Sequence, residues 1–259
     1  MSGRILCARA EAVATVTLSN PGKLNAVDSA MWKSLAGLVA ELSRDEDLRC
    51  VIIRGDGDQA FAAGGDIEEF VSRRDTLERA MAYHAQAGAA LQALADCPQP
   101  TIALLQGACI GGGLEIAAQC DLRVCAQSSR LGAPINKLGF SMYPAEMASL
   151  LRLAGPACLL EMLLEGRVFG AAEALAKGLV TRVVADAEVV DEAYASARRI
   201  CAGAPLVARW HKQWLRRLQQ GAPLGEEELR ASFAFLDTDD YREGLAAFIE
   251  KRKPQFRGR

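Results

Sequence analysis

The sequence predicts an α/β core followed by a C-terminal helical region. A short, wholly apolar run at residues 50–53 and a similar run at residues 101–105 have the composition of strands that are buried on both faces of a sheet. Segments with helical spacing separate these runs, and strands that alternate with helices are typical of α/β proteins. β-prone segments cease after residue 184, and the chain beyond about residue 187 carries only helical patterns.

The first predicted elements are a strand, a turn and a helix. Residues 14–18 are β-prone, and the turn sequence Asn20-Pro21-Gly22 follows them. After the turn, apolar residues recur at helical spacing behind residues 28 and 29, an Asp and a Ser that can cap a helix. These apolar residues are Met31, Trp32, Leu35, Leu38, Val39 and Leu42.

The last strand and the helical region complete the chain. A helical pattern from Ala171 stops at Gly178, and residues 179–184 form the last convincing strand. The region beyond has too much apolar surface for a solvated extension, so we expect it to pack on the core or on another subunit. Its large apolar residues are Trp210, Trp214, Leu215, Phe233, Phe235, Leu236, Leu245 and Phe248. We therefore expect a core over residues 1–190 and a helical region for oligomer packing over residues 191–259.

Composition excludes several classes of partner. With 259 residues, 51% of them hydrophobic, the chain can bury the core of one domain. Thirty Lys and Arg against 32 Asp and Glu leave a net charge of −2, so no overall field attracts nucleic acid or acidic lipid. No apolar run reaches the ~18 residues of a membrane span, and no export signal is visible. We expect neither a nucleic-acid nor a membrane partner.

The cysteines and histidines do not favour disulfide or metal chemistry. Eight cysteines are scattered without a CxxC pair, several of them in apolar runs, which predicts reduced core thiols in a cytoplasmic protein. His84 and His211 lie outside glycine-rich and carboxylate-rich segments, and we interpret both as surface or packing residues. The sequence predicts no metal site.

The first glycine-rich turn lies in residues 61–70, FAAGGDIEEF. Small residues here allow a ligand to approach the main chain closely. Asp66 and Glu69 form a capping pattern for a following helix. The alternative is a loop and a capped helix with no ligand.

The second glycine-rich turn lies in residues 106–115, QGACIGGGLE, after a buried strand. We expect it to open a helix from Leu114 to about Cys120. Unpaired N–H groups and the helix dipole at such a start stabilise an oxyanion. The turn matches neither a P-loop nor a dinucleotide fingerprint. The alternative is that the glycines only allow the helix to pack closely on the sheet.

Glu115 adds a carboxyl group to this second turn. It lies within one helical turn of Gly112, and we expect the helix dipole to keep it ionised as a base. The alternative is an acidic residue that only complements the helix start. N–H donors aimed at a developing negative oxygen, with a carboxylate nearby, are suited to chemistry beside a carbonyl group.

Taken together, six segments of the chain resemble the enoyl-CoA hydratase/isomerase, or crotonase, family in order and spacing. The segments are residues 21–26 (PGKLNA), 61–67 (FAAGGDI), 106–126 (QGACIGGGLE, then AAQCDLRVCA), 130–140 (RLGAPINKLGF), 171–184 (AAEALAKGLVTRVV) and 235–256 (FLDTDDYREGLAAFIEKRKPQF). The resemblance implies a spiral of ββα units. It also implies a homotrimer or a dimer of trimers, with the C-terminal helices at the trimer contact.

The resemblance also implies the site residues. Gly65 and Gly112 would supply the two N–H groups of an oxyanion hole, beside Glu115. The residues implied along the bound coenzyme A (CoA) are Ala63, Asp66 and Ile67, together with the two glycines. Lys23 would contact a CoA phosphate, as would the basic run at residues 251–253, although a solvated position is the alternative for both. The acyl-CoA thioester is the substrate, and no separate cofactor is implied.

One departure from the family pattern bears on the reaction. Family hydratases hold the attacking water with two glutamates; Glu115 matches the first, but Ile135 occupies the position of the second. Loss of an acid–base partner typically costs about 10² to 10⁴ in rate. Asn136, Tyr143 and Glu146 are the nearby polar candidates, with a structural role as the alternative for each.

We therefore predict an acyl-CoA enzyme that stabilises a thioester enolate. Hydration of a 2,3-unsaturated acyl-CoA, or the reverse dehydration, is the leading interpretation. The alternatives are a decarboxylase or a double-bond isomerase of the same family, because both need the hole without a doubly held water. Ile135 and Tyr143 loosely match the pattern of family decarboxylases. A further alternative is a catalytically silent acyl-CoA-binding member.

Overall fold

The computed structural model describes residues 3–259, and its strands form two sheets. The main sheet has the order β1-β2-β3-β5-β7-β10, and the small sheet has the order β4-β6-β8-β9. The main-sheet strands are β1 (Arg4–Ala10), β2 (Val13–Ser19), β3 (Cys50–Gly55), β5 (Thr101–Leu105), β7 (Leu122–Ala126) and β10 (Arg182–Val184). The small-sheet strands are β4 (Ala60–Ala62), β6 (Ala108–Ile110), β8 (Arg130–Gly132) and β9 (Val168–Gly170).

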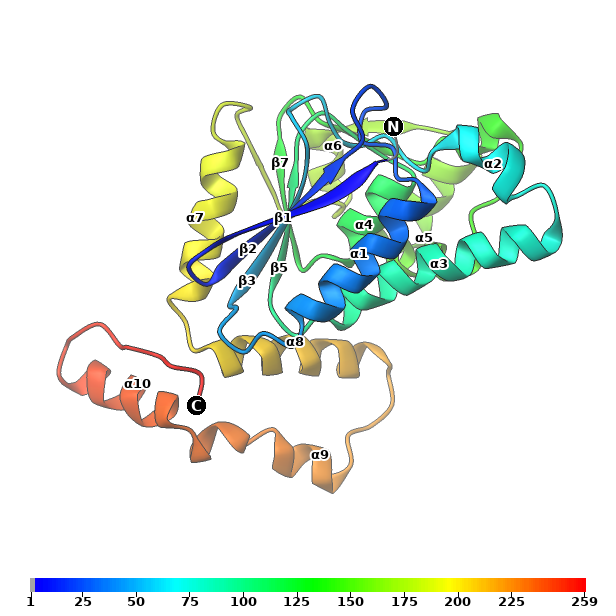
Figure 1. The fold of residues 1–259 in the computed structure, drawn as a ribbon. Helices are drawn as coiled ribbons and strands as arrows, with labels where there is room; N and C mark the ends of the chain where they lie inside the picture. Colours follow the sequence, from blue (N-terminus) through cyan, green and yellow to red (C-terminus); the bar gives the residue numbers. More distant parts are fainter. Residues whose placement is uncertain (1–2) are drawn as a thin grey trace.

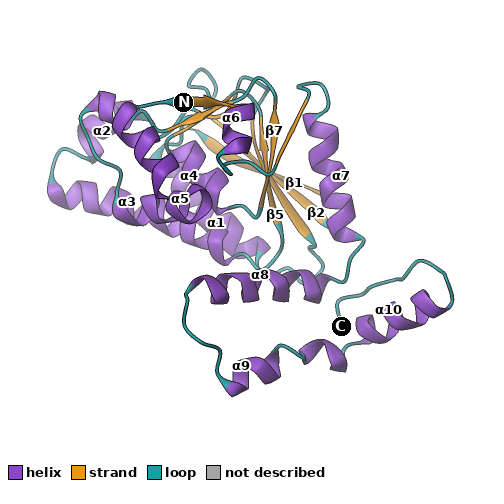
Figure 2. Ribbon diagram, turned by 180° about the vertical axis from the view of Figure 1, so that it is seen from behind, coloured by secondary structure: helices purple, strands orange, loops and turns teal. Residues whose placement is uncertain are grey.

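The helices cover both faces of the main sheet. Figure 1 shows α1, α3 and α4 on one face and α7 on the other, and Figure 2 shows the same layers from behind. The α-helices are α1 (Ser29–Leu42), α2 (Ile67–Arg73), α3 (Leu77–Asp96), α4 (Gly112–Gln119), α5 (Pro144–Glu165), α6 (Ala171–Ala176), α7 (Val189–Cys201), α8 (Pro205–Gln219), α9 (Glu226–Ala231) and α10 (Asp239–Ile249). Two short 3₁₀ helices are η1 (Ile135–Leu138) and η2 (Ala234–Asp237).

A unit of two strands followed by a helix occurs four times along the chain. This repetition confirms the predicted α/β spiral. From the second unit onward, the first strand joins the main sheet and the second joins the small sheet, as in β3 and β4, β5 and β6, and β7 and β8. The pairs β2–β3, β3–β5, β5–β7 and β7–β10 are parallel, as are β4–β6 and β6–β8. The carboxyl ends of β4 and β6 therefore lie next to each other.

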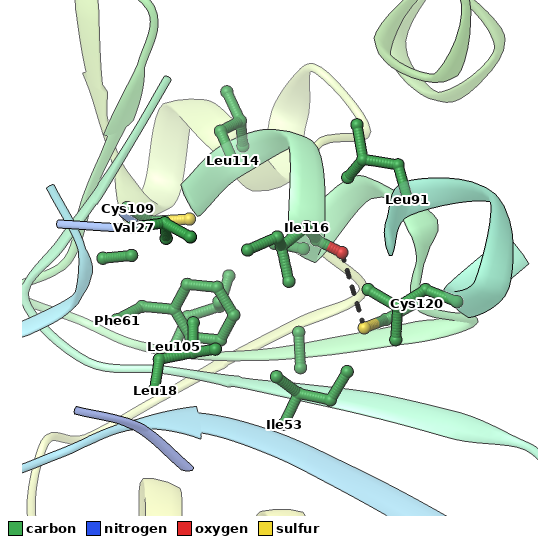
Figure 3. Packing of buried hydrophobic residues seen from close by; sticks show 14 of the residues in the cluster. Leu18, Val27, Ile53, Phe61, Leu91, Leu105, Cys109, Leu114, Ile116 and Cys120 are labelled. Atoms are coloured by element: carbon green, nitrogen blue, oxygen red, sulfur yellow. Dashed lines mark hydrogen bonds between the residues drawn. The ribbon is translucent and has the colours of Figure 1, made fainter. Parts of the chain in front are cut away.

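The main core lies between the sheet and helices α1, α3, α4 and α5. Figure 3 shows Leu18, Ile53 and Phe61 in this layer, beneath Ile116 of α4. A smaller cluster on the opposite sheet face is covered by α7. Because the central strands β3 and β5 are buried on both faces, their sequences are largely apolar, as the runs at residues 50–53 and 101–105 predict.

Several predicted ends of helices and strands are confirmed, and others differ from the prediction by a few residues. Asp28 caps α1 by accepting a hydrogen bond from Met31 N at 2.8 Å. Helix α6 ends at Ala176, and Gly178, with φ of +76°, follows its C-cap Lys177 as the predicted stop. The predicted strand at residues 179–184 is shorter, because pairing with β7 begins only at Arg182. Helix α4 begins at Gly112, two residues before its predicted start.

Strand β1 was not predicted. It pairs antiparallel with β2 at the edge of the sheet, and nearly all of its side chains are exposed. An exposed edge strand lacks the apolar pattern by which a strand is recognised, and its backbone pairing is invisible in the sequence.

Helix α8 joins the C-terminal region to the core. The buried Lys212 ammonium lies 2.6 Å from the Asp121 carboxylate and donates to Gln99 O at 2.8 Å. Helices α9 and α10 extend beyond α8, away from the sheet (Figures 1 and 2). Helix α7 crosses the proposed boundary at residues 190 and 191 and packs on the sheet, so the boundary stays a prediction.

Helix α5 is long and apolar enough, by length and composition, to cross a membrane. The sequence did not indicate it because charged residues interrupt the apolar run. A helix of a protein core can meet the same criterion. Helix α5 packs against α4 and contributes buried residues to the main core. Its backbone departs from helical geometry at Gly155, with φ of +75°, directly before Pro156.

Candidate active site

The two glycine-rich turns meet at the carboxyl ends of β4 and β6. Gly64 follows β4 with φ of +109°, and Gly111 follows β6 with φ of +49°, both in a region that favours glycine. A Cβ atom added to Gly111 would lie 3.6 Å from the Cα atom of Gly64. Parallel pairing of two short strands therefore brings together two glycines, Gly64 and Gly111, that are 47 residues apart in the sequence.

Two main-chain N–H groups converge between these turns. A Cβ atom added to Gly112 would lie 3.5 Å from the nitrogen of Gly65. Gly112 is the first residue of α4, and Gly65 is bridged by Val27, which bonds Gly64 O at 2.8 Å and Asp66 N at 3.0 Å. Neither the Gly65 nor the Gly112 N–H donates a hydrogen bond within residues 3–259. Both donors are therefore free for a ligand.

The glycines of the second turn have different functions in the fold. A Cβ atom on Gly113 would lie 2.4 Å from Ala62 O, so this residue is a glycine because α4 packs closely on β4. Gly112 instead lines a cavity. The packing interpretation of the motif therefore applies to Gly113.

The cavity runs past both free N–H groups and is walled mainly by apolar and aromatic side chains. Its lining includes Trp32, Ala63, Gly65, Ile67, Phe70, Arg74, Tyr83, His84, Gly112, Glu115, Ile135, Leu138, Phe140, Met142 and Glu146. Trp32 Nε1 donates a hydrogen bond to the Tyr83 hydroxyl at 3.2 Å, which fixes the wall behind the glycines.

Glu115 lies in this cavity and is only 7% exposed. Its carboxyl group makes no side-chain hydrogen bond within residues 3–259. Burial raises the pKa of Glu115 well above its usual range, the charge of Glu146 raises it further, and Arg74 lowers it. This direction runs against the prediction that the helix dipole keeps Glu115 ionised, because burial penalises the charged form of a carboxyl group.

The residues implied along bound CoA lie at or near this cavity. Ala63 and Ile67 line it, whereas Asp66 caps α2 by accepting from Glu68 N at 3.2 Å. Glu69 does not complete a capping box, because its carboxylate accepts from Ser29 N and Oγ instead.

Two of the cations proposed for CoA phosphates, Lys23 and Arg252, pair with carboxylates of this protein. Lys23 Nζ lies 2.7 Å from carboxylate oxygens of both Asp66 and Glu68, and these bonds raise the pKa of Lys23. In the basic run, Arg252 bonds the carboxylates of Glu243 and Glu250. Their contact with phosphate stays a prediction.

The three polar candidates downstream of Ile135 have different positions and contacts in the structure. Asn136 Nδ2 donates to Leu164 O at 2.9 Å and ties η1 to the end of α5. Tyr143 precedes α5, and its ring stacks on that of His84. Among the three, Glu146 lines the cavity. Oε1 of Glu146 lies 2.7 Å from Nδ1 of His84.

Sequence reasoning missed His84, Tyr83 and Arg74 as cavity residues. His84 was interpreted as a surface or packing residue, but it is 9% exposed and pairs with Glu146. A signal was available, because His84 shares the apolar face of α3 with Ala87 and Leu91. Arg74 lies over the Phe70 and Phe140 rings, 4.3 and 4.5 Å from their centroids. No sequence spacing indicates that contact.

Comparison with known proteins places these features in a family. The sequence profile described as enoyl-CoA hydratase/isomerase matches residues 8–259. A probable enoyl-CoA hydratase of Mycobacterium bovis is 37% identical over 257 residues, covering 97% of each chain. The short-chain-enoyl-CoA hydratase of Clostridium acetobutylicum is 32% identical, covering 93% of this chain and 92% of the relative.

Solved structures have the same fold. The crystal structure of an enoyl-CoA hydratase/carnithine racemase from Magnetospirillum magneticum superposes with a TM-score of 0.97 at 49% identity. The superposition covers 98% of this chain and 96% of that chain. An enoyl-CoA hydratase/isomerase family protein from Hyphomonas neptunium gives a TM-score of 0.93 at 34% identity, covering 98% of each.

Proposed function

Because this chain belongs to the enoyl-CoA hydratase/isomerase family, we propose that it adds water reversibly to 2,3-unsaturated acyl-CoA thioesters. One observation carries the proposal: two unpaired main-chain N–H groups converge in an apolar cavity beside a buried glutamic acid. An enolate oxygen is the anion that such a pair of donors would stabilise next to a proton donor.

The residues divide this chemistry between them. When water adds to C3, negative charge develops on the thioester oxygen, and the N–H groups of Gly65 and Gly112 would bind that oxygen. Donors that are fixed before the reaction stabilise the transition state without reorganising. Glu115 would move a proton at the acyl chain. The acyl-CoA is the substrate, and the proposal needs no further cofactor or metal.

The segment between β4 and α2 would bind the CoA part of the substrate. Ala63 and Ile67 border the cavity, and the main chain between them carries the Gly65 donor. Asp66 and Lys23 form an ion pair beside this segment, where Lys23 would meet a phosphate group.

Wild-type protein is expected to consume crotonyl-CoA, measured as loss of the absorbance of the conjugated thioester. Release of carbon dioxide from a malonyl-type CoA ester without hydration would instead establish a decarboxylase. A shift of a 3,4 double bond without hydration would establish an isomerase. Binding of CoA esters with no turnover would establish a silent member.

We also propose that the protein forms a homotrimer or a dimer of trimers through its C-terminal helices. Helix α10 and the preceding segment carry large apolar side chains that stay largely exposed among residues 3–259. These are Phe233, Leu236, Leu245, Phe248 and Ile249, with Phe248 85% exposed. Several large exposed apolar side chains on one helix and the segment before it are typical of subunit contacts.

Phe248→Asp is expected to shift the protein toward monomer, because a charge at the centre of an apolar contact loses hydration on assembly. Light scattering after size exclusion measures the change in mass. Leu77→Asp, which introduces the same charge at an exposed leucine of α3, should leave the mass unchanged. A wild-type protein that is already monomeric would contradict the proposal.

A cytoplasmic location is a further part of the proposal. All eight cysteines are free, and burial raises the pKa of several of them, that of Cys120 to about 12. Unpaired buried thiols support a reducing compartment.

A further inference from the structure

A second buried carboxyl group shares the cavity with Glu115. Glu146 lies in the first turn of α5 and is 7% exposed, as Glu115 is. Both side chains line the same cavity. Ile135 also lines it, with an alkyl side chain where the family pattern has its second glutamate. The cavity therefore holds two carboxyl groups, although the second comes from another element.

His84 holds Glu146 in position. Its Nδ1 lies 2.7 Å from Oε1 of Glu146, and its ring stacks on Tyr143 with centroids 4.7 Å apart and 19° between the planes. Tyr83 packs edge-on against the same imidazole at 5.7 Å. An ionised carboxylate only accepts hydrogen bonds, so Nδ1 is the donor whenever Glu146 is ionised. Oε2 of Glu146 makes no hydrogen bond within residues 3–259, which leaves it available to a water.

The other charged and titratable groups around Glu146 are few. Glu115 faces it from α4, His84 and Tyr83 from α3, and Arg74 from the end of α2. Two carboxylates in one apolar cavity repel each other, and burial disfavours the charged form of each. Burial and the charge of Glu146 raise the pKa of Glu115, which favours Glu115 as the protonated member.

We propose that Glu146, oriented by His84, is the second catalytic carboxyl group: it takes a proton from the attacking water while Glu115 gives its proton to C2. This assignment rests on the proposed hydration. It gives an α5 residue the task that the family assigns to the position of Ile135. His84 is a positioning residue, because it acts through Glu146.

The proposed step balances. The water oxygen bonds to C3, one water proton passes to Glu146, and the C2–C3 π electrons move onto the thioester as an enolate. The enolate then takes the proton of Glu115 at C2, and the carbonyl re-forms. The two carboxyl groups have exchanged protonation states, so one proton passes from Glu146 back to Glu115 after the product leaves. One water has been added.

Two reactions that would occur in the same cavity distinguish the role of Glu146 from that of Glu115. Hydration of crotonyl-CoA would need both, whereas exchange of the C2 hydrogens of butyryl-CoA in D₂O would need only the two N–H groups and the ionised form of Glu115, which takes a C2 proton and returns a deuteron. Glu146→Gln is expected to lower kcat for hydration by about 10²-fold with KM within about threefold, because an acid–base group is lost. Exchange, followed by NMR, should stay within about threefold of wild type.

Two further variants complete the test. Glu165→Gln makes the same change at an exposed position of α5 and should leave both rates unchanged. His84→Phe keeps a ring against Tyr143 but removes the hydrogen bond, so hydration should fall about tenfold with exchange retained. This variant also decides the matter if Glu146→Gln does not fold.

The outcomes distinguish this assignment from the proposed function. Hydration retained in Glu146→Gln, or hydration and exchange lost in parallel, would overturn the role of Glu146 while the hydratase function stands. A wild-type protein that exchanges C2 hydrogens but hydrates no enoyl-CoA would instead overturn the function.

Discussion

Glu115→Gln is expected to lower kcat for crotonyl-CoA hydration by about 10³ to 10⁴-fold, the upper part of the range for losing an acid–base group. Glutamine preserves the shape of the side chain but cannot give a proton to C2. Exchange of the C2 hydrogens should be lost as well, which separates this variant from Glu146→Gln. The measurements are the initial rate of absorbance loss and the NMR exchange rate.

Stability provides the control for Glu115→Gln. The wild-type carboxyl group is buried, so the neutral amide loses less hydration than the charged form would. We expect the melting temperature to be equal to that of wild type or higher. A variant that melts well below wild type would show that Glu115 supports the fold, and its lost activity would not then identify a proton donor.

The raised pKa of Glu115 also sets the direction of the pH dependence. A group that must be protonated to act loses activity as pH rises through its pKa. Since the pKa of Glu115 is raised by burial and by Glu146, wild-type hydration should persist to higher pH than an ordinary glutamic acid would allow. A hydration rate that already decreases as the pH is raised past about 5 would contradict this assignment.

Gly112→Pro is expected to lower kcat/KM for hydration by about 10² to 10³-fold, the usual effect of removing one oxyanion donor. Gly112 is the first residue of α4, where proline is compatible with a helix because the N–H has no helical acceptor. The substitution therefore deletes the donor while the helix start is retained.

Gly112→Ala is the matched control for this donor. It adds the same Cβ atom, 3.1 Å from Cζ2 of Trp32, but keeps the N–H group. The difference in kcat/KM between the proline and alanine variants therefore excludes the shared Cβ atom and measures the loss of the N–H together with the ring carbons that replace it. Equal rates for the two variants would show that the Gly112 N–H does not bind the thioester oxygen.

Much of the core could be predicted because its signals are local. The strands at residues 50–53 and 101–105 are largely apolar since they are buried on both faces, and Asp28 caps α1 where the pattern places it. Both glycine-rich turns and Glu115 were recognised for the same reason. Their residue types are unusual over a short stretch of sequence.

The rest of the site depends on contacts that no short pattern records. Strands β4 and β6 have three residues each, too few to show a period, yet their pairing brings the two N–H groups together. His84 and Glu146 are 62 residues apart and meet only because α3 packs against α5. The resemblance placed the second carboxyl group next to Pro134, whereas the fold supplies one from the following helix.

The bridge between Val27 and Gly65 makes the oxyanion hole a product of the finished fold. The Gly65 donor is held in place by Val27, in the segment before α1, and the Gly112 donor is the first residue of α4. No single local segment of the chain therefore contains both donors and the residue that holds them. A partly folded chain can contain either helix and still lack the paired donors. Recovery of enzymatic turnover after denaturation would therefore report the completion of long-range packing rather than the return of helical content.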